Sequence, residues 1–254
     1  MIQLGAQMYT VCQYTQKEDD LLRTFEKIRK IGYESVQVSG IGADIPVAAV
    51  AEGLKANGLT CAVTHISYDD CLNKLPEVID KHKAWGCEYV GVGSMPDRYR
   101  SAEGLVTFAK EATEVADKLQ EAGLKFVYHN HNFEFRKYGD KLGMDILFDN
   151  SGKNFQFELD TFWVQKGAGD VRAWIEKVAG RMDVIHFKDM MLSENCDQLM
   201  AEIGQGNLNW PGILETCRKT NVRWFMVEQD DCNGRCPFES LKMSYEYLTG
   251  LGLK

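Results

Sequence analysis

Short apolar stretches with strand character alternate with longer amphipathic segments along the whole chain. The short stretches are rich in β-branched and aromatic residues, which favour strands. The eight predicted strands are IQLGAQMY, SVQVSG, TCAVTHIS, YVGVGS, KFVYHNH, NFQFELDTF, DVIHFKD and RWFMVEQD, which begin at residues 2, 35, 60, 89, 125, 154, 183 and 223.

The segments between these strands have apolar residues at helical spacing. Helices are predicted over residues 18–32, 46–58, 72–86, 102–123 and 170–180. Each of these segments ends in a glycine, which suits the C-terminus of a helix. The predicted secondary structure is therefore a regular alternation of strand and helix.

The alternation continues without a linker or a low-complexity segment, so we predict one domain over residues 1–254. Eight β/α units in a chain of 254 residues predict an α/β fold, a single (β/α)8 TIM barrel. The alternative is a doubly wound open sheet. Such a sheet is expected to have a glycine-rich phosphate loop after its first strand, and AQMYTVCQYTQ contains no glycine.

The charge balance narrows the classes of partner. The chain has 29 Lys and Arg residues and 37 Asp and Glu residues, a net charge of −8, which disfavours nucleic acid and leaves small polar substrates and metal ions. No signal peptide and no apolar run long enough to cross a membrane is evident, so we expect a cytoplasmic protein with reduced cysteines. The sequence is compatible with a homo-oligomer.

Ionisable residues gather at the C-terminal ends of the predicted strands, where a TIM barrel carries its chemistry. Side chains alternate faces along a strand, so residues two apart point the same way. The same-face pairs are His129 with His131, Glu158 with Asp160, His186 with Lys188, and Glu228 with Asp230, and His65 ends the third strand. Of the five histidines, only His82 lies away from a strand end, in a predicted helix, where we expect it to face solvent.

A single histidine or aspartate at a strand end is more often a hydrogen-bonded structural group than a ligand. Several such groups meeting at one barrel mouth would repel or desolvate one another unless a cation or a substrate compensates. A divalent metal ion would compensate and keep the carboxylates ionised. Mixed carboxylate and imidazole ligands suit one ion of Mn²⁺, Zn²⁺, Co²⁺ or Mg²⁺.

Seven stretches of the chain match a known family: GAQMYTV, YHNHNFEF, FELDTFWVQKGAGDV, RMDVIHFKDM, EIGQGNLNWPGIL, VEQDD and PFESLKMSYEYL. Taken together, they resemble the sugar phosphate isomerase/epimerase family of xylose isomerase-like TIM barrels, over nearly the whole chain. The HNHxxEF pattern on the fifth strand resembles the subset of that family that acts on oxidised sugars, including 3-keto-glycosides.

The resemblance implies a metal held by a Glu, an Asp, a His and a second Glu from strands five to eight. By motif, Asp160, His186 and Glu228 correspond to the last three. The position of the first Glu is occupied by His129 in this chain. Either an imidazole of HNH binds the metal, or Glu134 folds back to supply the carboxylate. We favour Glu134, which keeps the charge of the related sites and leaves the histidines to face the substrate.

Such a site makes the C–H beside a carbonyl acidic and leads to an enediolate. Glu228 is a candidate base, and His129 or His131 a candidate second acid/base. Lys188 would stabilise the oxyanion, unless it only forms an ion pair with Asp189 or Glu158. His65 is expected to bind the substrate.

The predicted function is a metal-dependent isomerase or epimerase acting on a keto-sugar or keto-glycoside. The alternative is a metal-dependent lyase or dehydratase acting on a keto-sugar, a 3-keto-glycoside or a keto-inositol. A nuclease for abasic sites shares the barrel, but the charge of −8 disfavours it. A sugar-binding barrel without catalysis would have little use for the ordered Glu, Asp, His and Glu set.

Overall fold

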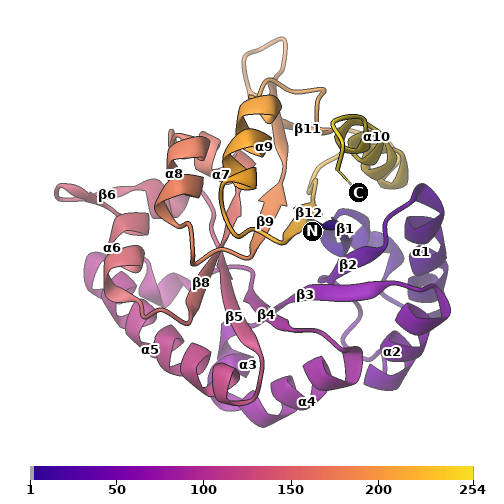
Figure 1. Ribbon diagram of the computed structural model, residues 1–254, viewed down its shortest axis with the longest axis horizontal. Helices are drawn as coiled ribbons and strands as arrows, with labels where there is room; N and C mark the ends of the chain where they lie inside the picture. The colour runs from indigo at the N-terminus through magenta and orange to yellow at the C-terminus, as the bar shows by residue number, and fades with distance from the viewer. Residues whose placement is uncertain (1–2, 254) are drawn as a thin grey trace.

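A computed structural model describes residues 3–253 as one closed barrel of eight parallel strands with helices around it (Figure 1). The strand order around the barrel is β1-β12-β9-β8-β5-β4-β3-β2, which confirms the predicted (β/α)8 fold. The predicted first strand includes Ile2, which lies outside the described residues. The barrel strands are β1 (Gln3–Gln7), β2 (Ser35–Val38), β3 (Thr60–Ile66), β4 (Tyr89–Val92), β5 (Lys125–His129), β8 (Phe155–Asp160), β9 (Val184–Phe187) and β12 (Trp224–Val227).

The helices form the outer layer, and all five predicted helices are present. The segment predicted over residues 72–86 is divided at Lys74, because Pro76 lacks an N–H and suits the first turn of a new helix. The α-helices are α1 (Glu18–Ile31), α2 (Val47–Ala56), α3 (Tyr68–Asn73), α4 (Leu75–Trp85), α5 (Ala102–Glu121), α6 (Gly143–Asn150), α7 (Thr161–Lys166), α8 (Val171–Lys177), α9 (Trp210–Arg218) and α10 (Pro237–Gly250). Within the described residues, none of them is long and apolar enough to cross a membrane.

Additional short elements lie in the connections between strands and helices. Two antiparallel hairpins join β6 (Lys137–Tyr138) to β7 (Lys141–Leu142) and β10 (Asp189–Leu192) to β11 (Gln198–Ala201). Three 3₁₀ turns are η1 (Met8–Tyr14), η2 (Asp97–Tyr99) and η3 (Phe133–Phe135). The β6–β7 and β10–β11 hairpins follow β5 and β9, so both stand at the C-terminal end of the barrel.

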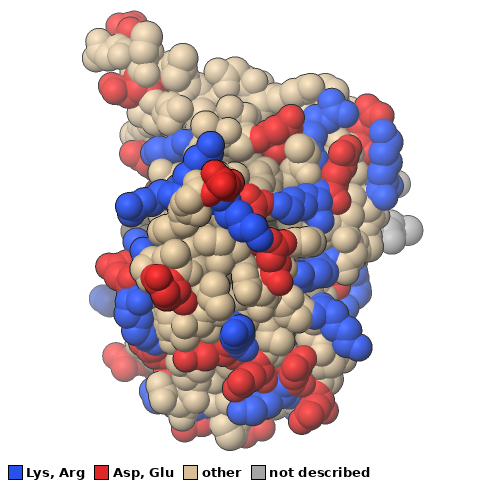
Figure 2. All heavy atoms as spheres, turned by 90° about the vertical axis from the view of Figure 1, so that its left-hand side faces the viewer, with Lys and Arg blue, Asp and Glu red and all other residues tan. Residues whose placement is uncertain are grey.

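The barrel interior is filled at its N-terminal end by a small apolar cluster that includes Tyr89, Trp224 and Met226. Gly5 allows close packing there, because a Cβ atom at this position would lie 2.5 Å from the Met226 Cε. Packed side chains therefore close the barrel interior at this end. Over the face that Figure 2 shows, positive and negative side chains are interspersed, without a field of one sign.

His82 was predicted to face solvent, and this prediction is wrong, because its side chain is fully buried between α4 and β3. Its Nδ1 lies 2.7 Å from the Val78 carbonyl oxygen and its Nε2 2.7 Å from the Thr64 Oγ1. The backbone carbonyl can only accept, so Nδ1 carries the proton and Nε2 accepts from the Thr64 hydroxyl. Burial lowers the pKa of His82 to about 4.

The burial of His82 predicts a loss of stability in mild acid. Between pH 6.5 and about 4 the unfolded chain binds a proton here that the folded chain does not. The free energy of unfolding should therefore fall as the pH is lowered through this window, by on the order of 3 kcal/mol from this residue. Urea unfolding of the wild type and of His82→Gln at pH 6.5 and pH 4.5 measures this contribution. Equal pH dependence in the two proteins would contradict the prediction.

Candidate metal centre

Four side chains from adjacent strands converge at the C-terminal mouth of the barrel. His129 ends β5, Asp160 ends β8, His186 lies on β9, and Glu228 follows β12. One ligand atom from each lies within 4.8 Å of the others, and all four residues are buried. We call His129, Asp160, His186 and Glu228 the ligand cluster. The sequence predicted the last three as ligands and left open whether the fourth is an imidazole of HNH or Glu134, and the structure places His129 in the cluster.

His129 presents a lone pair to this cluster. Its Nδ1 lies 3.0 Å from the Gly93 carbonyl oxygen, which can only accept, so Nδ1 carries the proton in the neutral ring. Burial lowers the pKa of His129, which keeps the ring neutral. The unprotonated Nε2 therefore faces the Asp160 Oδ2 at 3.3 Å. Two acceptors at this distance repel each other unless a cation lies between them.

The His186 ring is also held by contacts of one nitrogen, its Nε2, so that the other points into the cluster. Its Nε2 lies 2.7 Å from the Gln37 Oε1 and 3.1 Å from the Glu158 Oε1. Its Nδ1 points into the cluster, 2.9 Å from the Glu228 Oε2 and 3.8 Å from the Asp160 Oδ2. Burial alone would lower the pKa of His186, but the carboxylates of Glu158 and Glu228 have the larger effect and raise it to about 10. Without a metal ion this ring is cationic, and ligation through Nδ1 would release that proton.

Glu158 supports the cluster from one layer deeper in the barrel. The Glu158 Oε2 accepts a hydrogen bond at 2.6 Å from the Nε2 of His65. The Nδ1 of His65 lies 3.4 Å from the Gln7 amide nitrogen, so both ring nitrogens have partners. Glu158, His65 and His186 form a second convergent group. Glu158 thus orients His186, as carboxylates commonly do for metal-binding histidines.

Lys188 places an ammonium group at the edge of the ligand cluster. Its Nζ lies 2.7 Å from the Glu228 Oε2, 3.1 Å from the Asp160 Oδ2 and 3.0 Å from the Asp230 Oδ2. Burial alone would raise the pKa of Asp160 and Glu228, but Lys188 and the histidines hold both below the usual range. The ion pairs considered from the sequence, with Asp189 or Glu158, are therefore replaced by pairs with three other carboxylates.

Asp189 has a separate structural task. Its carboxylate accepts hydrogen bonds from the backbone N–H groups of residues 190, 204, 206 and 208 and from the Trp210 indole. The Lys188 backbone is fixed as well, because its N–H donates to the Thr161 hydroxyl and its carbonyl accepts from the same hydroxyl. Lys188 is therefore held at both ends, by its backbone and by the ion pairs of its ammonium group.

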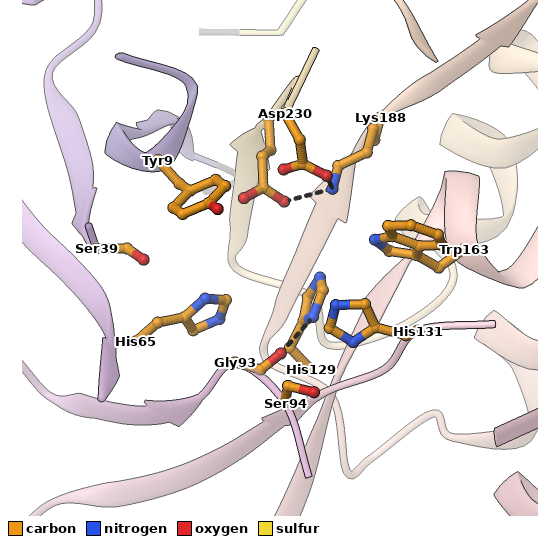
Figure 3. Close-up of a pocket in the computed structure, with 11 residues that line it drawn as sticks. Tyr9, Ser39, His65, Gly93, Ser94, His129, His131, Trp163, Lys188 and Asp230 are labelled. Atoms are coloured by element: carbon orange, nitrogen blue, oxygen red, sulfur yellow. Dashed lines mark hydrogen bonds and ion pairs between the residues drawn. The ribbon is translucent and has the colours of Figure 1, made fainter. Parts of the chain in front are cut away.

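A pocket of about 380 Å³ opens above the cluster (Figure 3). We call it the catalytic pocket. Its lining residues are Tyr9, Ser39, His65, Gly93, Ser94, His129, His131, Trp163, Lys188, Glu228 and Asp230. Most of the polar members were predicted from the sequence, but Trp163 and Tyr9 were not. Tyr9 is 46% exposed, and no polar strand-end pattern marked it.

His131 faces the catalytic pocket opposite His65, with its ring 5.1 Å from that of Trp163. Its Nδ1 is buried and has no hydrogen-bond partner among the described residues. The Trp163 indole nitrogen is likewise unpartnered. Burial and the neighbouring His129 lower the pKa of His131 to about 3, which favours a neutral hydrogen-bonding role at neutral pH.

Glu134 is not brought into the ligand cluster. Glu134 lies in the 3₁₀ turn η3, its side chain is not part of the ligand cluster, and the residue is fully buried. The Tyr128 hydroxyl donates to its Oε1 at 2.6 Å, and the His131 backbone N–H donates to its Oε2 at 3.0 Å. Burial raises the pKa of Glu134 to about 7. The contacts indicate that Glu134 holds the HNH loop in place.

Comparisons with known proteins agree with this architecture. The Rhizopine catabolism protein MocC of Rhizobium meliloti is 24% identical over 157 residues, covering 56% of this chain and about half (48%) of that protein. A sugar phosphate isomerase/epimerase structure from Parabacteroides distasonis superposes with a TM-score of 0.81, at 20% identity, covering 97% of this chain and 95% of the other. An L-ribulose 3-epimerase structure gives a TM-score of 0.74 at 18% identity, covering 100% and 95%. The model of the xylose isomerase-like TIM barrel family matches residues 25–244, so the chain belongs to this family.

Proposed function

We propose that the protein is a divalent-metal-dependent isomerase or epimerase that acts on a keto-sugar or keto-glycoside. The observation that carries the proposal is the pair of imidazole nitrogens, on His129 and His186, that face carboxylate oxygens in a buried site. Two nitrogens and two carboxylate oxygens form a donor set that fits Zn²⁺, Mn²⁺ or Co²⁺. A divalent ion bound by His129, Asp160, His186 and Glu228 would polarise a substrate carbonyl and stabilise negative charge on its oxygen.

The residues around the cluster supply the proton chemistry. Glu228 is the proposed base, because its carboxylate borders the catalytic pocket and Lys188 keeps it ionised. Removal of the proton beside the carbonyl gives an enediolate. The Lys188 ammonium provides positive charge for the developing oxyanion. Neutral His131 binds and orients a substrate hydroxyl, and His65 forms the opposite wall of the pocket.

The alternative is a lyase that uses the same enediolate and expels a β-oxygen substituent. Asp230 is the observation that favours it, because this carboxyl lies at the pocket rim, and desolvation and Glu228 raise its pKa to about 6 although Lys188 lowers it. A carboxyl with a pKa this close to neutrality could take up a proton and pass it to the leaving oxygen. Turnover in deuterated water separates the two functions. Deuterium in a recovered sugar of unchanged formula supports the isomerase or epimerase, whereas a product lighter by water or an aglycone supports the lyase.

Removal of the metal is expected to abolish turnover. Dialysis against a chelator should reduce activity on free keto-sugars and 3-keto-glycosides by more than ~100-fold, because catalysis by ionisation beside a carbonyl then loses its main electrostatic stabilisation. Titration with Mn²⁺, Co²⁺ or Zn²⁺ should restore it, with one ion per chain in elemental analysis. Full activity in protein shown to be free of divalent ions would refute the metal-dependent proposal.

A further inference from the structure

We propose that Gln37 is a positioning residue of the metal centre and holds the His186 ring with its Nδ1 toward the ligand cluster. This inference rests on the proposed function, because it concerns the metal site that the function needs. Gln37 lies on β2 and is fully buried. Its Oε1 lies 2.7 Å from the His186 Nε2. None of the site residues predicted from the sequence lies on β2, so this contact comes from outside the predicted site.

Gln37 reaches His186 across the interior of the barrel. Its strand β2 and the strand of His186, β9, are separated by β1 and β12 in the strand order, so side chains alone make the contact. The pairing of β2 with β3 is irregular at this residue, with a register shift between Val36 and Gln37. Such irregularities occur next to active sites, where they re-aim a side chain. The shift therefore lies at the residue whose side chain contacts His186.

The contacts of the His186 Nε2 define where its proton lies. Two oxygens face this nitrogen, the Gln37 Oε1 at 2.7 Å and the Glu158 Oε1 at 3.1 Å. Both oxygens are acceptors, so the Nε2 carries a proton. A ring that keeps its proton on Nε2 leaves Nδ1 to face the cluster as a ligand. The partner of the Nε2 proton therefore sets the aim of the Nδ1.

Gln37, and not Glu158, receives this proton in a hydrogen bond. The Glu158 Oε1 is buried and has no hydrogen-bond partner among the described residues, although it lies near the Nε2. The other oxygen of Glu158 accepts from His65 at 2.6 Å. Glu158 thus attracts the His186 ring by its charge. The direction of the N–H bond is fixed by Gln37, whose neutral amide adds no charge to the site.

The amide nitrogen of Gln37 shows that packing alone does not favour this residue. The Gln37 Nε2 is buried and has no hydrogen-bond partner within residues 3–253. A buried donor without a partner destabilises a fold, so an apolar side chain of the same length would suit the barrel interior better. A residue that breaks a packing rule in this way is expected where it serves a site. The hydrogen bond from His186 is the contact that offsets the cost.

The neighbouring strand offers a matched control. Gln7 of β1 pairs with Gln37 in the register of the two strands and is also fully buried. Its Nε2 lies 3.4 Å from the His65 Nδ1, and its Oε1 accepts from the Tyr9 N–H at 3.0 Å. Neither partner belongs to the ligand cluster. A change at Gln7 therefore removes the same chemical group without removing a partner of a metal ligand.

Titration calorimetry of the full chain with Mn²⁺ tests the inference. Gln37→Met keeps the side-chain length but removes the acceptor, and it should weaken Mn²⁺ binding by about 10- to 100-fold, the usual loss for a partner of a metal ligand. Gln37→Glu keeps an oxygen acceptor and Gln7→Met leaves His186 untouched, so each should lose less than about threefold. Undiminished affinity in Gln37→Met would overturn the inference. An equal loss in Gln37→Glu would also overturn it, because packing and not the acceptor would then be responsible.

A measurement on the metal-free protein detects the hydrogen bond itself. With isotopically labelled histidine, the Nε2–H of His186 should give a slowly exchanging, low-field proton signal in nuclear magnetic resonance. Gln7→Met should retain this signal and Gln37→Met should lose it, whereas a wild type without the signal would contradict the assignment. Mn²⁺ affinities that follow the expected pattern in a protein that turns over no keto-sugar would support the role of Gln37 and count against the proposed reaction.

Discussion

Replacing Asp160 with asparagine is expected to weaken the binding of a divalent ion by more than ~100-fold and to abolish turnover. Loss of a residue that only hydrogen-bonds to a metal ligand already reduces metal affinity by about 10- to 100-fold, so loss of a ligand should reduce it more. The substitution removes the negative charge from the oxygen that faces His129 and His186. Isothermal titration with Mn²⁺ measures the affinity. An asparagine variant that binds the ion as tightly as the wild type would exclude Asp160 from the ligands.

The chain offers a matched control for this experiment. The Asp160 Oδ1 accepts from the Trp163 N–H and caps α7, while the Asp170 Oδ1 accepts from the N–H groups of Arg172 and Ala173 and caps α8. Asparagine is as good a cap as aspartate, so neither helix should lose its start. Asp170→Asn should therefore retain both affinity and activity, and thermal unfolding should change little in either variant.

Replacing His129 with alanine should reduce metal affinity by more than ~100-fold, whereas Glu134→Gln should change it by less than about threefold. The reason is geometric, because His129 aims a lone pair at the cluster and Glu134 accepts from Tyr128 and His131 instead. Glutamine keeps the size of Glu134 and can still accept from the His131 N–H. Titration of the two variants with Mn²⁺ and Zn²⁺ compares them directly.

His131→Ala serves as the control for this pair, since it removes a pocket imidazole that packs against the His129 ring but is not itself a member of the ligand cluster. We expect it to raise the KM for the sugar, because it removes a group that binds the substrate equally in the ground state and the transition state. Its metal affinity should stay within about threefold of the wild type. The opposite pattern, with Glu134→Gln losing the ion and His129→Ala keeping it, would restore the carboxylate assignment made from the sequence.

The barrel and most of the mouth were predictable because local pattern and topology agree. Strand period, helix period and glycine placement each indicate β/α units, and a closed parallel barrel then brings all C-terminal strand ends together. This was enough to place Asp160, His186 and Glu228 at or just beyond strand ends, and the family resemblance then singled them out as candidate ligands. Their meeting in one cluster follows from the register in which Asp160 pairs with His186.

The choice between His129 and Glu134 could not be made from the sequence, because the position of Glu134 depends on a turn rather than on strand alternation. After His129 the chain leaves the strand, and η3 folds Glu134 back under the HNH loop toward Tyr128. No periodicity marks such a turn, and charge balance alone favoured the carboxylate. The burial of His82 has a similar origin, since its partner Thr64 is distant in sequence and belongs to the barrel wall.

The contacts of Lys188 bear on how the protein matures. Lys188 and the protonated His186 together offset the charges of Asp160 and Glu228, so the mouth of the barrel is paired without an ion. An ion bound as proposed would take over the contacts that Lys188 makes with Asp160 and Glu228 and would leave it the pair with Asp230. Under the proposed function, binding of the metal would then be an exchange of one cation for another at a finished barrel, and not a step on which folding waits.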